Sequence, residues 1–128
     1  LYFHAAKDEV VAHGLKGPWE CEETFARDGY GGKLDLHQRQ IVIIDIKTTD
    51  KPLEGLKTWD DHDMQLAAYR HGVNDPGAQC GILYISTKDV AAKLIMIPEA
   101  KLVRGLAKFM ALKTYFYADR GLTIGGTP

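Results

Sequence analysis

The sequence predicts one α/β domain in which helices cover a mixed β-sheet. The order of apolar and polar residues indicates a helix, three strands, a helix, two strands and a last helix, which is typical of a sheet with helices packed against it. The apolar run Ile41–Ile44 is typical of a strand that is buried on both of its faces. A chain of 128 residues is long enough to bury a core of this kind.

The first half of the chain carries the first helix and three of the strands. Apolar residues recur there at helical spacing, and they then alternate with polar residues at the spacing of strands. Arg27-Asp28-Gly29 is typical of a hairpin turn. The expected elements are a helix over residues 3–13, strands over 19–25 and 30–37, and a strand over 41–48 that follows a polar turn at 38–40.

The second half is expected to hold two helices around two strands. A helix starts at Asp60 or Asp61, where an aspartate caps free N–H groups, and Pro98 is favoured at a helix start. The expected elements are a helix to about residue 72, a turn at 74–77, strands over 79–87 and 90–97, a helix over 98–118 and a flexible tail over 121–128. We expect a single domain over residues 1–128, in which Leu1-Tyr2-Phe3 resembles the end of a cleavable tag linker.

Composition excludes some classes of protein. The formal net charge of −1 gives no general attraction to nucleic acid, so such a partner needs local basic patches or a bound cation. Apolar runs are too short to span a membrane, and we expect a cytoplasmic protein.

Cys21 and Cys80 lie in apolar, strand-like contexts and are expected to be buried free thiols. The histidines at element ends, His13, His37 and His71, are expected at the surface.

Three charged residues at the ends of neighbouring strands predict a functional site. Asp35 and Asp45 are joined by a tight turn, and Lys47 lies on the same face of its strand as Asp45. Two carboxylates that meet would raise each other's pKa, and a hard cation such as Mg²⁺ removes that repulsion. Lys47 could then hold an attacking water or stabilise charge that develops on a phosphate. The alternatives are a turn aspartate at Asp35 and a surface ion pair between Asp45 and Lys47.

Other residues are candidates for supporting this site. Gln65 and Tyr69 are four apart on a helix and would form a polar ledge, either at the site or with their tips in water.

The glycine pair Gly31-Gly32 within a strand indicates a bulge or a close approach of another backbone or a ligand. The cluster Trp59–Asp63 could be a second metal site, but helix capping is the simpler explanation, and His62 within it could still contact a substrate or a metal. Lys101, Arg104 and Lys108 form a basic stripe that is either solvated or contacts a DNA backbone, and Glu20 and Glu22 are expected on a strand face near the mouth of the cleft.

Taken in order, these motifs resemble the PD-(D/E)XK nuclease superfamily. Gly31-Gly32-Lys33-Leu34-Asp35, then Asp45-Ile46-Lys47, then Gln65-x-x-x-Tyr69 is most similar to the branch of RecB-type and phage exonucleases. The resemblance covers residues 3–87. It implies a restriction-endonuclease-like core and a Mg²⁺- or Mn²⁺-dependent deoxyribonuclease. The implied partner is DNA, single- or double-stranded, and the implied role is in recombination, repair or replication.

The resemblance also implies roles for individual residues. Asp35, Asp45 and the Ile46 carbonyl would be metal ligands, Lys47 the catalytic lysine, and Gln65 and Tyr69 members of the site. RecB-type members usually add a histidine from the first helix, or a glutamate in related branches. His4 and Glu9 are the candidates for that ligand.

Two other functions fit the same residues. One is a catalytically silent module that binds nucleic acid with the nuclease fold, and the other is a metal-dependent hydrolase of a small nucleotide. Polarity and the preference for single or double strands stay open. The residues do not decide between exonuclease and endonuclease action, but the resemblance through Gln65-x-x-x-Tyr69 favours exonuclease-like action. The small domain has little beyond its core to clamp DNA, so a further segment, a homo-oligomer or a recombination partner is expected to supply the clamp.

Overall fold

A computed structural model describes residues 2–122 of the chain; the first residue and most of the expected tail lie outside this range. Within it, the expected order of elements is confirmed, with boundaries that differ from the expected ones by a few residues. The elements are α1 (Tyr2–Ala12), β1 (Glu20–Arg27), β2 (Tyr30–Gln38), β3 (Val42–Thr49), α2 (Asp60–Gly72), β4 (Gln79–Ser86), β5 (Ala92–Met96) and α3 (Glu99–Asp119).

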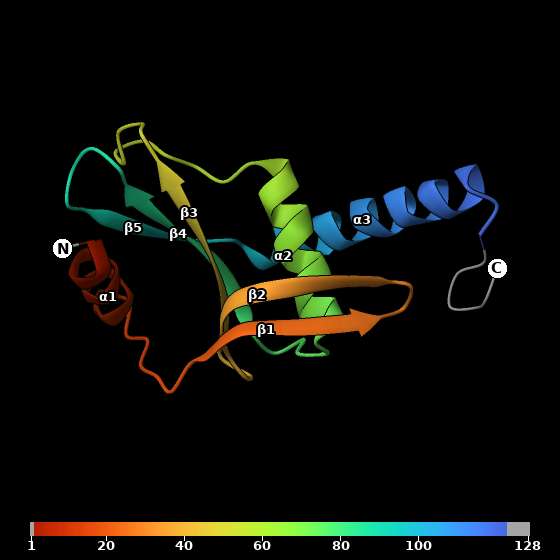
Figure 1. Cartoon of the computed structure of the whole chain (residues 1–128), viewed down its shortest axis with the longest axis horizontal. Helices are drawn as coiled ribbons and strands as arrows, with labels where there is room; N and C mark the ends of the chain where they lie inside the picture. Colours follow the sequence, from red (N-terminus) through yellow and green to blue (C-terminus); the bar gives the residue numbers. More distant parts are fainter. Residues whose placement is uncertain (1, 123–128) are drawn as a thin grey trace.

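The five strands form one mixed sheet in the order β1-β2-β3-β4-β5. The neighbours β1 and β2, β2 and β3, and β4 and β5 run antiparallel, whereas β3 and β4 are parallel. A parallel pair needs a crossover connection, and α2 lies in the one between β3 and β4. Figure 1 shows α1 beside β5, and α2 and α3 together on the other side of the sheet. The α/β fold with helices on a mixed sheet is therefore as the sequence predicts.

The side chains of β3 enter two cores, one on each face of the sheet. Ile43 packs with Leu66 of α2 and Leu102 of α3 in the larger core. Val42 and Ile44 point the other way and pack with Val10 of α1. All three β3 residues are fully buried, as expected for a strand covered on both faces. Asp45 and Lys47 continue the alternation of Ile43 and lie on the α2 face.

The glycine pair marks a close approach, as predicted. A Cβ at Gly31 would lie 2.8 Å from the carbonyl oxygen of Phe25, and one at Gly32 would lie 2.6 Å from a ring carbon of Tyr69. Gly31 therefore lets β1 and β2 lie close together, and Gly32 lets the β1–β2 hairpin run close across α2 (Figure 1). The Tyr30 hydroxyl also donates a 2.6 Å hydrogen bond to the Ala68 carbonyl of α2.

Three local predictions were wrong. His37 is not at the surface but fully buried, because carboxylates of Glu23 and Asp75 lie against its two ring nitrogens. Cys21 is exposed, since β1 is an edge strand, while Cys80 is buried as expected. The N-cap of α2 is Trp59, which makes no side-chain capping bond.

In the part of the chain that the structure describes, no helix combines the length and the apolar character that crossing a membrane requires.

Candidate active site

Asp35 lies at the point where β2 separates from β3. The pairing of these strands runs from Gln38 opposite Val42 to Leu36 opposite Ile44 and continues no further. At the next position the Asp35 Oδ2 atom accepts a 2.7 Å hydrogen bond from the Ile46 N–H. The carboxylate thus takes the place of a backbone acceptor, and it is held at the fork between the two strands.

Asp45 and Lys47 complete a charged group with Asp35 at this fork. The Lys47 Nζ atom lies 2.9 Å from Asp45 Oδ2, and the Asp45 residue is only 8% exposed. Burial raises the pKa of Asp45, and the nearby Asp35 carboxylate adds to this rise while Lys47 opposes it. The net effect is a raised pKa, so the lysine compensates the two acids only in part.

This group fits a hard divalent cation. The buried Asp45 Oδ2 receives no hydrogen bond from residues 2–122 beyond its ion contact with Lys47. The Ile46 carbonyl points to the same edge of β3 as the Ile46 N–H, because both groups of one strand residue face the same neighbour. Two carboxylates and one carbonyl, partly open to water, are the oxygen donors that Mg²⁺ and Mn²⁺ take.

Gln65 and Tyr69 are joined to each other on α2. The Gln65 Nε2 atom donates a 2.8 Å hydrogen bond to the Tyr69 hydroxyl. The Tyr69 ring packs edge-on against Phe25, with ring centroids 5.8 Å apart. The two residues form the expected ledge on the sheet face that carries Asp45. Within the described residues, however, no hydrogen bond joins them to Asp45 or Lys47.

Two residues that the sequence reasoning did not assign also line the site. Tyr84 is the partner of Lys47 in the register of β3 and β4, and its hydroxyl lies 3.3 Å from His62 Nδ1. Burial and the positive charge of Lys47 lower the pKa of His62, which keeps the imidazole neutral at neutral pH. Burial also raises the pKa of Tyr84. The spacing of His62 and Gln65, three apart on α2, is the sequence signal that places His62 on this face.

The two candidate ligands from the first helix are not brought to Asp35 and Asp45 by any described contact. Glu9 Oε2 accepts a 2.6 Å hydrogen bond from the Leu94 N–H of β5. This oxygen of Glu9 is therefore already hydrogen-bonded to β5. The neighbouring residue Val10 packs on the face of the sheet opposite α2. His4 lies exposed in the first part of α1, and its role as a ligand stays a prediction.

Replacing Asp45 with asparagine is expected to stabilise the metal-free protein by about 1 kcal/mol at neutral pH. A carboxylate whose pKa is raised by folding destabilises the fold once it ionises. The advantage of Asp45→Asn should therefore be full above the folded pKa and should shrink as the pH falls through it. Urea unfolding in EDTA at several pH values measures this difference. Asp50→Asn, at an exposed position, is the control. The prediction would be contradicted if the Asp45→Asn protein were less stable at neutral pH than both the wild type and the Asp50→Asn protein.

Comparison with known proteins gives a structural likeness and no match by sequence. No family model and no curated protein matches the chain. Among solved structures, it is similar to a "Putative exonuclease" from Eubacterium rectale, with a TM-score of 0.67 and 16% identity over 94% of this chain and 52% of that chain. Another structure, SSO0001, has a TM-score of 0.48 and 22% identity over 87% of this chain and 56% of that one.

The chain therefore spans about half the length of the proteins that it resembles. The first likeness shows that the mixed sheet and its helices form a fold shared with an exonuclease-named neighbour.

Proposed function

We propose that the protein is a metal-dependent DNA nuclease of the PD-(D/E)XK superfamily, RecB-type, with exonuclease-like action. The observation that carries the proposal is the group at the fork of β2 and β3. There Asp35 accepts the Ile46 N–H at 2.7 Å, and Lys47 lies 2.9 Å from the buried Asp45. The α/β fold shared with an exonuclease-named protein supports it.

Asp35, Asp45 and the Ile46 carbonyl would hold Mg²⁺ or Mn²⁺. When bound, such an ion supplies charge neutralisation at the scissile phosphate and lowers the pKa of a coordinated water. The chain itself supplies the positions of the two acids. Asp35 is fixed by its bond to β3, and Asp45 is fixed because Ile43 and Ile44 before it are fully buried. Rigid donors of this kind need little reorganisation during the reaction.

Lys47 would orient the attacking water or neutralise charge that develops on the phosphate. Its side chain is 29% exposed, so the ammonium reaches solvent and substrate while it is held by Asp45. Gln65 and Tyr69 would contact a substrate phosphate or water from α2. The neutral His62 imidazole, bonded to Tyr84, would accept or donate a hydrogen bond beside Lys47.

A basic hollow next to the site suits a polyanionic substrate. The Tyr84 hydroxyl donates to the Lys57 carbonyl at 3.4 Å, which connects the site to the loop before α2. A hollow of about 400 Å³ is lined by Lys57, Thr58, Trp59, Asp61 and Lys101, and a second one by Asp63, Lys101, Arg104, Gly105 and Lys108. In each of them the basic side chains outnumber the single aspartate. Basic side chains arranged along a groove can follow a phosphate backbone, and an exposed tryptophan can stack on a base.

Cleavage assays on defined DNA test the proposal. Linear, nicked, circular and single-stranded DNA would each be incubated with Mg²⁺, with Mn²⁺ or with EDTA. We expect shortening of linear DNA with either metal and none in EDTA. Cleavage of closed circles would exclude a purely end-dependent enzyme. Metal-dependent binding of DNA without cleavage of any substrate would contradict nuclease activity and favour the silent binding module.

A further inference from the structure

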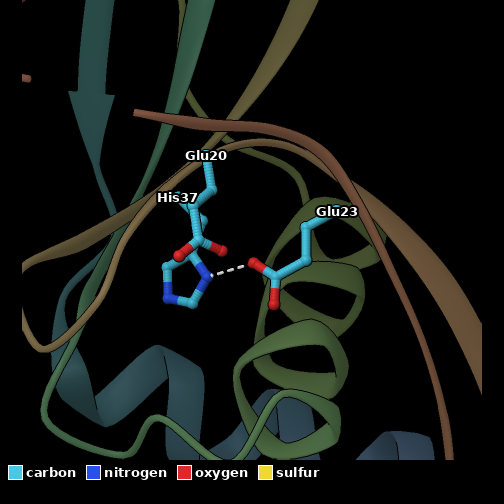
Figure 2. Close-up of side chains that lie close together, drawn as sticks. All are labelled: Glu20, Glu23 and His37. Carbon is cyan, nitrogen blue, oxygen red and sulfur yellow. Dashed lines mark hydrogen bonds and ion pairs between the residues drawn. The ribbon is translucent and has the colours of Figure 1, made fainter. Parts of the chain in front are cut away.

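A second group of metal-ligating side chains lies at the start of β1 and the end of β2. Glu20, Glu23 and His37 each offer one ligand atom, and these three atoms lie within 4.8 Å of one another. Figure 2 shows both carboxyl groups beside the Nδ1 edge of the His37 ring, with Glu23 Oε1 2.6 Å from Nδ1. None of these residues belongs to the proposed nuclease site.

The backbone of β1 brings the two glutamates to one face. Residues three apart on a regular strand point to opposite faces, so Glu20 and Glu23 would be expected to separate. Glu22, between them, has a φ of 54°, which is uncommon for a residue other than glycine and interrupts the alternation. Glu20 is also the direct cross-strand partner of His37. Both carboxyl groups therefore converge on the same ring.

Asp75 holds the other edge of the His37 ring. His37 is fully buried, and its Nε2 atom lies 2.7 Å from Oδ2 of Asp75 in the turn after α2. The same oxygen of Asp75 accepts a 2.8 Å hydrogen bond from the Gln40 N–H, so Asp75 acts as an acceptor toward the ring. A carboxylate that accepts from Nε2 leaves Nδ1 facing the two glutamates. Metal-bound histidines commonly have this arrangement. Without metal, Nδ1 and Glu23 Oε1 share a proton across 2.6 Å, and a bound metal ion would release that proton to solvent and take the Nδ1 lone pair.

We propose that Glu20, Glu23 and His37 bind a divalent transition-metal ion of the Zn²⁺ class, with Asp75 orienting the histidine. An imidazole nitrogen with two carboxylate oxygens suits such ions better than Mg²⁺, which prefers oxygen ligands. Three carboxylates around one imidazole leave an excess of negative charge, and a dication placed between Nδ1 and the glutamates reduces it. The exposed side of Glu20 leaves room for a water ligand.

The ion would join segments that are distant in the sequence. It would tie β1 to β2 directly and, through His37 and Asp75, to the turn between α2 and β4. We therefore expect it to stabilise the base of the hairpin that carries Asp35, without contacting the nuclease site.

Metal binding to a variant that lacks the nuclease site tests the proposal. Asp35→Asn with Asp45→Asn removes both proposed Mg²⁺ ligands, and this protein would be titrated with Zn²⁺ alone in a calorimeter, and with Co²⁺ in a spectrophotometer. We expect one Zn²⁺ per chain and visible Co²⁺ bands. Adding Glu20→Gln or Glu23→Gln should weaken Zn²⁺ binding at least about tenfold, and Asp75→Asn should weaken it about 10- to 100-fold.

Glu22→Gln is the matched control. Glu22 lies on the same strand, but its carboxylate pairs with Lys33 at 3.3 Å and is not part of the cluster. Its replacement should leave Zn²⁺ affinity unchanged, and circular dichroism would verify that every variant is folded. Absence of Zn²⁺ binding to the double variant would overturn the proposal, as would equal affinities of the Glu20→Gln, Glu23→Gln and Glu22→Gln proteins. Neither result bears on DNA cleavage.

Discussion

Replacing Lys47 with alanine is expected to lower DNA cleavage about 10³-fold in the presence of Mg²⁺ or Mn²⁺. A positioned cation that stabilises developing charge or holds the nucleophile contributes about 10²–10⁴ in rate. Lys47 is the only described cation that forms an ion pair with Asp45, at 2.9 Å. Within the described chain, no other ammonium or guanidinium group occupies that position and could replace it. Rates from single-turnover cleavage of linear DNA would measure the loss.

Lys51→Ala is the matched control for this experiment. Lys51 lies exposed in the loop after β3, so its replacement with alanine removes the same charge from the same region of the protein. Its loss should change cleavage by less than about tenfold, chiefly through weaker attraction of DNA at low salt. DNA binding by the Lys47→Ala protein should be retained. If that protein cleaves DNA at a rate within tenfold of the wild type, Lys47 is not the catalytic lysine.

The sequence was sufficient to predict the sheet and the group around Asp45. Ile41–Ile44 indicated a doubly buried strand, and all of it except the exposed Ile41 is buried. The turn between Asp35 and Asp45 is short enough that antiparallel pairing must bring the two residues close together. The register observed, with Leu36 opposite Ile44, does this. Local periodicity and one tight turn determine such contacts, so they can be read without a structure.

Contacts between distant segments could not be predicted in this way. His37 is buried because Glu23, 14 positions away, and Asp75, 38 positions away, both reach its ring. Tyr84 and His62 lie beside Lys47 only because β4 pairs in parallel with β3 and α2 crosses over that pair. Cys21 is exposed because β1 forms the edge of the sheet, and a strand's position in the sheet is not visible in its own residues.

Replacing Gly105 with leucine is expected to destabilise the protein by about 3 kcal/mol, which would lower the melting temperature by about 10 °C. Gly105 is buried where α3 crosses α2. A Cβ there would lie 2.9 Å from the Asp63 carbonyl oxygen and 3.1 Å from the Met64 Cα. These are backbone atoms of a helix, so the two helices must move apart. The gain of about 1 kcal/mol in helix propensity over glycine is too small to offset this displacement.

Ala107→Leu is the matched control, because it separates the effect of contact with α2 from the effect of adding a leucine to α3. Ala107 lies two positions on in α3 and is exposed, so leucine there adds the same side chain to the same helix without meeting α2. Thermal unfolding should place Ala107→Leu near the wild type and Gly105→Leu well below both. Since α2 carries His62, Gln65 and Tyr69, its displacement should also reduce DNA cleavage by Gly105→Leu at temperatures where the protein is still folded. Equal melting temperatures for the two leucine variants would show that α2 and α3 do not depend on glycine for their close packing.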